Sequence, residues 1–120
     1  MRNSNSGQPD TRTSEPPDPR MFTHSVYFWL RDDLSPEATR RFVDGIRSLT
    51  TIESVQHGFI GTPAATDREI IDRSYSYALV VSFADEAGHE AYQVHPVHDR
   101  FREQCAGSWK KIVIYDAVSA

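Results

Sequence analysis

In residues 75–83, large apolar or aromatic side chains alternate strictly with smaller ones. The large side chains are those of Tyr75, Tyr77, Leu79, Val81 and Phe83. Such a period of two predicts a β-strand, because successive side chains of a strand point to opposite faces of its sheet. Residues 22–30 are also rich in aromatic and β-branched side chains, which favour strands. In the outer half of that stretch both parities are apolar, so both faces of the sheet should be covered.

The intervals between these strands carry start and stop signals for helices and for two further strands. Ser35 and Pro36 predict a helix start, because serine caps the first N–H groups and proline fits the first turn. The buried stripe of this helix is predicted to be Ala38, Phe42, Ile46 and Leu49. Further elements are predicted as strands at 54–60 and 112–116, as a helix capped by Asp85 that reaches Val94, and as a helix from Val97 to about Gly107. The order β-α-β-β-α-β predicts an α+β fold, a ferredoxin-like sandwich with helices on one face of an antiparallel sheet.

Residues 2–20 hold four of the seven prolines and no apolar side chain. Such a segment cannot contribute to a core, so residues 1–20 are expected to form a disordered N-terminal tail and residues 21–120 a single domain. The bare face of a four-stranded sheet would expose Tyr27 and Trp29. An exposed apolar patch of this kind marks an association surface, and we expect two copies to pack sheet against sheet as a homodimer.

Composition limits the classes of partner. The net charge of −4 argues against nucleic acid, and no run of 18 apolar residues exists to span a membrane. The single cysteine, Cys105, permits no internal disulfide, which fits a cytoplasmic location. Its place on the apolar helix stripe predicts a small buried hydrophobe rather than a nucleophile.

The residues with chemistry gather in 92–98, where Tyr92, His95 and His98 surround Pro96. Proline disfavours helical geometry at the residue before it, so one helix should end near Val94 and another begin after it. His98 could act as a general base near neutral pH, and the Tyr92 hydroxyl could stabilise an oxyanion. Asp116 is a candidate acceptor for the second ring nitrogen of His98.

Together with the strand pattern, the sequence Tyr92-Gln-Val-His-Pro-Val-His98 resembles the stress-responsive dimeric α/β-barrel (Dabb) family over residues 21–120. The resemblance implies a homodimer whose two sheets form a central barrel. One branch of this family is the olivetolic acid cyclase branch, which consists of polyketide cyclases that close a ring by aldol chemistry. Similarity to that branch implies that Tyr92 and His98 are catalytic. The same similarity implies that four residues contact the substrate: His24, Ile46, Tyr77 and His95. At Ile46 and Tyr77 the chain departs from the branch, which changes the pocket shape.

Each of these residues also has a structural interpretation. His98 could be a core histidine bonded to a carbonyl, His95 a cap of the preceding helix, and Tyr92 a packing aromatic. His24 could be a buried strand imidazole. A metal site formed by His24, His95 and His98 lacks a zinc-binding spacing, so we expect neither metal nor cofactor. The remaining histidines, His57 and His89, are expected to face solvent.

Three functions are therefore compatible with the sequence. The first is a stress-response dimer without a known activity, whose role comes from its stability or from binding a small apolar ligand. The second is a cofactor-independent, polyketide cyclase-like or lyase-like enzyme with His98 as general base and Tyr92 as oxyanion donor, acting on a polyketide-like ligand. The third, a monooxygenase of the antibiotic-biosynthesis type, fits the Tyr-x-x-His-Pro-x-His pattern less well.

Overall fold

The computed structural model describes residues 20–120. Within its sheet, β1 (Phe22–Leu30) is an inner strand and pairs antiparallel with a strand on each side. Its neighbours are β3 (Tyr77–Phe83) and β4 (Trp109–Val118). β2 (His57–Gly61) pairs antiparallel with the other edge of β3, so the four strands follow the order β2-β3-β1-β4. The expected N-terminal tail falls almost entirely on residues 1–19, outside the described residues.

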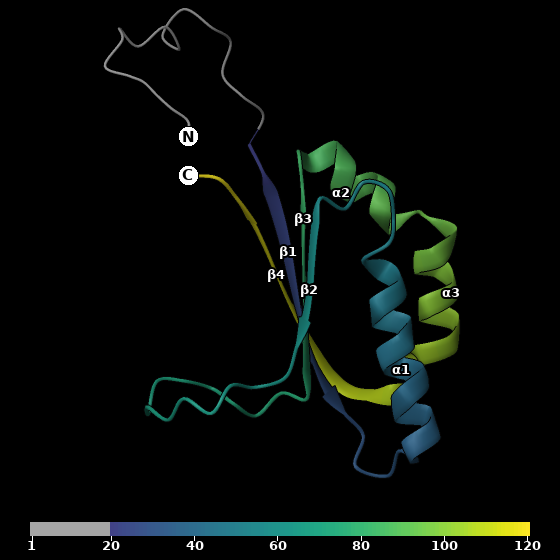
Figure 1. Cartoon of the computed structure of the whole chain (residues 1–120), viewed down its shortest axis with the longest axis vertical. Helices are drawn as coiled ribbons and strands as arrows, with labels where there is room; N and C mark the ends of the chain where they lie inside the picture. Colours follow the sequence, from purple (N-terminus) through teal and green to yellow (C-terminus); the bar gives the residue numbers. More distant parts are fainter. Residues whose placement is uncertain (1–19) are drawn as a thin grey trace, which may run out of the picture.

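The helices of the described residues all lie on one side of this sheet (Figure 1). They are α1 (Pro36–Leu49), α2 (Glu86–Gln93) and α3 (Pro96–Cys105), followed by a short 3₁₀ turn, η2 (Ala106–Ser108). The predicted caps are present: Ser35 Oγ accepts from the Ala38 N–H at 3.0 Å and Asp85 Oδ1 from the Gly88 N–H at 3.0 Å. This arrangement is a ferredoxin-like α+β sandwich, which confirms the predicted fold class.

Some element bounds differ from the prediction. β4 is longer than the predicted 112–116, because it pairs with nearly the whole of β1, from Phe22 opposite Val118 to Leu30 opposite Trp109. β2 begins later than predicted, at His57, because residues 50–55 continue from α1 in hydrogen-bonded turns. β3 begins at Tyr77 rather than Tyr75.

The core lies between the sheet and the helices. Alternate residues of β1, among them Phe22, Val26 and Phe28, point under the helices and are buried. They meet the α1 stripe of Phe42 and Ile46, both fully buried, as predicted. The side-chain alternation of β1 thus divides the strand into a helix-covered face and an opposite face.

We call that opposite face of the sheet the open face; the strand register places on it Tyr27, Trp29, Phe59, Val80, Val113 and Tyr115. Phe59 and Tyr115 are 61% and 64% exposed. The β2–β3 connection, residues 62–76, extends away from the sheet on this side (Figure 1), and its Ile70 is 79% exposed. In the described part of the chain, no helix has the length and apolar character needed to cross a bilayer.

α3 packs directly against α1 at Gly45. A methyl group at this position would lie 2.9 Å from Cys105 Sγ and 2.9 Å from Phe101 Cδ1. Both neighbours are buried, at 2% and 6% exposure, so neither can move aside freely. The absence of a side chain at Gly45 therefore sets the distance between the two helices.

We expect Gly45→Ala to destabilise the protein, although alanine normally stabilises a helix over glycine by about 0.5–1 kcal/mol. Forcing a methyl group into a packed core costs about 1–3 kcal/mol, which outweighs that gain. Urea unfolding of the variant should show a lower free energy of unfolding. Gly107→Ala is the control, because a Cβ at Gly107 meets nothing within 4 Å. Equal stability of wild type and Gly45→Ala would mean that the helices can separate at no cost.

Candidate ligand-binding site

A cavity of about 290 Å³ lies between the helices and the inner face of β4. It forms because the helices cover β1 and β3 but leave β4 partly uncovered. Ile112 and Ile114, whose register places them on the helix side, are still 38% and 49% exposed. Most of the wall is apolar, and the polar lining residues are His24, Tyr92, Gln93, His98, Arg102 and Asp116.

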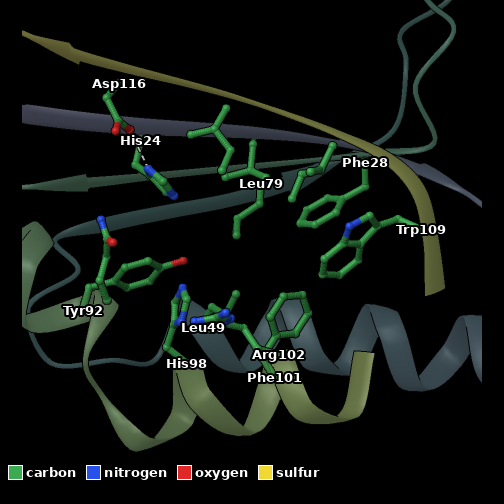
Figure 2. A pocket seen from close by; sticks show the side chains of 14 residues that line it. His24, Phe28, Leu49, Leu79, Tyr92, His98, Phe101, Arg102, Trp109 and Asp116 are labelled. Carbon is green, nitrogen blue, oxygen red and sulfur yellow. Dashed lines mark hydrogen bonds and ion pairs between the residues drawn. The ribbon is translucent and has the colours of Figure 1, made fainter. Parts of the chain in front are cut away.

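Tyr92 and His98 reach this cavity from two helices separated by the proline break. α2 ends at Gln93, and Pro96 occupies the first turn of α3, as the sequence predicts. The two rings meet edge to face, with centroids 5.1 Å apart. Figure 2 shows the Tyr92 hydroxyl turned toward the His98 ring and the cavity. The break therefore places a phenol and an imidazole together at one end of the cavity.

Burial sets the protonation state of both groups. It raises the pKa of the Tyr92 phenol above its usual range, so the hydroxyl keeps its proton. Burial, together with the positive charge of Arg102, lowers the pKa of His98, so this imidazole is neutral near pH 7. The His98 Nδ1 atom is buried, and no group within residues 20–120 hydrogen-bonds it.

The carboxylate of Asp116 hydrogen-bonds to His24. The expectation that Asp116 would orient His98 is therefore wrong. The Asp116 Oδ1 atom lies 2.5 Å from His24 Nδ1. The two residues are directly opposite each other in the β1–β4 register, so their side chains share one face. In Figure 2 the His24 ring points from β1 toward Tyr92. The second polar pair of the cavity is therefore carried by strands.

His89 is buried at 5% exposure, so the expectation that it would face solvent is wrong. Its ring stacks on Phe22, with centroids 4.3 Å apart, and lies 4.7 Å from the His24 ring. α2 crosses the end of β1 and turns this side of the helix inward. His57 is exposed, as expected, and Cys105 is a buried residue whose thiol pKa is raised by burial.

The sequence of residues 22–119 matches the family described as the stress responsive A/B barrel domain, or Dabb. The chain belongs to this family. The match covers the whole of the fold from β1 to β4, so the predicted membership of the Dabb family is confirmed. The likeness to the olivetolic acid cyclase branch stays a prediction. Among curated proteins, none matches the sequence.

Solved structures agree with this assignment. A Dabb family protein from Mesorhizobium loti is 27% identical, with a TM-score of 0.68 over 84% of this chain and 98% of that one. A dimeric ferredoxin-like protein of unknown function from Thermobifida fusca is 20% identical, with a TM-score of 0.68 over 84% and 92%. The hydroxynitrile lyase of Passiflora edulis is 17% identical, with a TM-score of 0.71 over 85% and 95%. The last two show that the fold is shared.

The Dabb fold brings together only part of the predicted site. Tyr92, His98 and His24 line the cavity, whereas Ile46, Tyr77 and His95 do not. His95 caps the start of the following helix, α3, rather than the end of the preceding one: its Nδ1 accepts from the Val97 N–H at 3.1 Å, and its Nε2 lies 3.0 Å from Glu53 Oε1. Ile46 is fully buried in the core. Sequence analysis does not predict Gln93 and Arg102 as lining residues, because Gln93 occupies an unspecified position of the Tyr-x-x-His-Pro-x-His pattern and Arg102 lies outside it.

The lowered pKa of His98 predicts that acid destabilises the protein. The folded state disfavours the protonated ring, so the unfolded state binds more protons as the pH falls below the ordinary value of 6.5. The free energy of unfolding, measured in urea at a series of pH values, should therefore fall below that pH. His89, whose pKa is also lowered by burial, acts in the same direction. His98→Gln should reduce this dependence on pH, and an unchanged slope would contradict the assignment.

Proposed function

We propose that this Dabb protein is a homodimer that binds a small, mainly apolar carbonyl compound in the cavity and catalyses acid–base chemistry on it, of lyase or cyclase type. The observation that carries the proposal is the meeting of the Tyr92 phenol and the His98 imidazole at one end of an otherwise apolar cavity. Ligand sites commonly combine apolar walls with a few convergent polar groups.

The cavity favours a small ligand. Its volume of about 290 Å³ is at the lower end of the range of ligand pockets, about 300–1,000 Å³. The wall away from Tyr92 is formed by side chains such as Phe28, Phe101 and Trp109 (Figure 2). An aromatic or short aliphatic group would fit against these rings, with its polar end directed to Tyr92 and His98.

The two polar groups have complementary roles in this chemistry. The neutral His98 ring can take a proton from a hydroxyl group or from a carbon beside a carbonyl. Proton removal leaves negative charge on the substrate oxygen, directly from a hydroxyl group or by delocalisation from the carbon, and the Tyr92 O–H donates a hydrogen bond to that oxygen. When the carbon–carbon bond has broken or formed, the imidazolium returns its proton to the product or leaving group. His98 thus ends the cycle neutral.

The shared fold of the Passiflora edulis hydroxynitrile lyase supports a lyase as the first activity to test. A hydroxynitrile presents a hydroxyl proton for a base and releases a carbonyl compound, which matches the pair of groups in the cavity. Polyketide-like carbonyl compounds are the second class, because their ring closure begins with proton removal beside a carbonyl. A role in a stress response stays a prediction based on the family description.

The homodimer is supported by the open face. Its aromatic and aliphatic side chains are partly or largely exposed in a single protomer, and a second copy packed sheet against sheet would bury them. The 62–76 connection extends on the same side and could contact the partner (Figure 1). The related proteins from Thermobifida fusca and a Jannaschia species are both described as dimeric.

Turnover of hydroxynitriles and polyketide-like carbonyl compounds tests the chemistry. We expect His98→Gln to lower kcat/KM by about 10²–10⁴-fold, because the base is lost. Tyr92→Phe should lower it by about 10²–10³-fold, since the ring remains and only the hydrogen-bond donor is removed.

His57→Gln is the matched control, because this exposed histidine lies on β2 and does not line the cavity. It should keep full activity. Undiminished turnover in both His98→Gln and Tyr92→Phe would refute the proposed chemistry. Binding of a panel compound without any turnover would restrict the function to ligand binding.

Tyr115→Glu tests the assembly. Tyr115 is 64% exposed in the protomer, so a carboxylate there costs the isolated fold little but would be buried in the dimer. Sedimentation should show a monomer of about the chain mass, 13.6 kDa. Val94→Glu, a change at a residue that is 75% exposed on the helix side, should remain dimeric. A Tyr115→Glu dimer as tight as wild type would place the interface elsewhere.

A further inference from the structure

We propose that His24, His89 and Asp116 form a binding site for a divalent transition-metal ion such as zinc, at the strand-borne end of the cavity. The three residues come from β1, α2 and β4, and one potential donor atom of each lies within 4.8 Å of the others. The proposal does not rest on the function proposed above, because it concerns binding of an ion by the protein alone.

Neither histidine has a full set of hydrogen-bond partners within residues 20–120. The Nδ1 atom of His24 is bonded to Asp116, and no protein group in the described part of the chain hydrogen-bonds its Nε2. Within residues 20–120, the nitrogens of His89 have one hydrogen-bond partner, the amide nitrogen of Gln93, at 2.9 Å and 3.3 Å. One amide cannot satisfy both the donor and the acceptor of an imidazole, whichever way it is oriented. A cation could take the place of the proton between His24 Nδ1 and Asp116 Oδ1 and also bind one nitrogen of His89.

The donor set is typical of transition metals. Neutral imidazole and carboxylate together suit zinc and its neighbours, and three protein ligands with one open position are usual for zinc sites that bind a further molecule. With metal–ligand bonds of about 2.0–2.2 Å, tetrahedral donor atoms lie about 3.4 Å apart. Adjustments of about an ångström in side-chain position bring these residues to that spacing. His24 and Asp116 also line the cavity, so the open position would face a ligand there.

The surroundings hold the two histidines in place. The His89 ring is stacked on Phe22 and packed edge to face against Phe83, with centroids 5.5 Å apart. The His24 position is set by the β1–β4 register. Both rings are nearly inaccessible, at 5% and 7% exposure, so an ion would exchange water for ligands that are already oriented. The half-exposed Asp116 carboxylate, at 42%, leaves a route for entry.

Calorimetric titration of the full chain with Zn²⁺, after treatment with a chelator, tests this site. We expect one ion per chain and a rise in the melting temperature of several degrees, because the ion binds only the folded state. Co²⁺ should give the visible absorption of a tetrahedral site. His89→Phe, which keeps the stacking on Phe22, and Asp116→Asn, which keeps a hydrogen-bond acceptor for His24, should each weaken Zn²⁺ binding at least tenfold.

His57→Gln is again the control, because an exposed histidine could bind zinc adventitiously. This variant should bind like wild type. No binding of one ion per chain, or equal binding in Asp116→Asn and wild type, would overturn the proposal, as would loss of binding in His57→Gln. Asp116→Asn decides the question even if His89→Phe fails to fold, because residue 116 lies on an edge strand. The titration contains no organic compound, so its result is separate from that of the turnover assays.

Discussion

The antiparallel pairing of β1 with β3 and β4 is the constraint on which the rest of the structure depends. It separates the residues of β1 by parity, so that Phe22, His24, Val26 and Phe28 lie under the helices and Tyr27 and Trp29 lie on the open face. A shift of one residue would exchange the two sets and place the aromatic core in solvent. The same pairing sets His24 opposite Asp116. One register thus positions the core, the association surface and the strand-borne part of the cavity.

The proline break is the second constraint, because it lets two short helices approach one cavity. A continuous helix through residues 86–105 would place Tyr92 and His98 six positions apart, which is far from a whole number of turns at 3.6 residues each. Pro96 ends that continuity, and His95 replaces the lost backbone interaction by capping α3 with its own ring. His95 therefore has a structural role, whereas the His98 side chain lines the cavity.

Local patterns in the sequence predicted the elements but not the pairs between them. The alternation at 75–83 and the Ser35–Pro36 start were sufficient for β3 and α1, because propensity, period and caps agree there. The burial of His89 could not be predicted, since the pattern of an eight-residue helix does not say how it crosses β1. The partner of Asp116 depends on the β1–β4 register, which single-strand patterns do not contain. For the same reason His98 was given an acceptor that belongs to His24.

The uncovered inner face of β4 explains why a hundred-residue domain can retain a cavity. Three short helices are enough to bury β1 and most of β3, and Ile112 and Ile114 remain partly exposed because no helix lies over them. Larger side chains that filled this space would bury more apolar surface and raise the free energy of unfolding, so the fold is less stable with the cavity than without it. The side chains at its polar end come from two independent parts of the fold, the helix break and the strand pair. Because a change at Tyr92 or His98 leaves the β1–β4 register intact, the chemistry of the cavity can vary while the fold that carries it is kept.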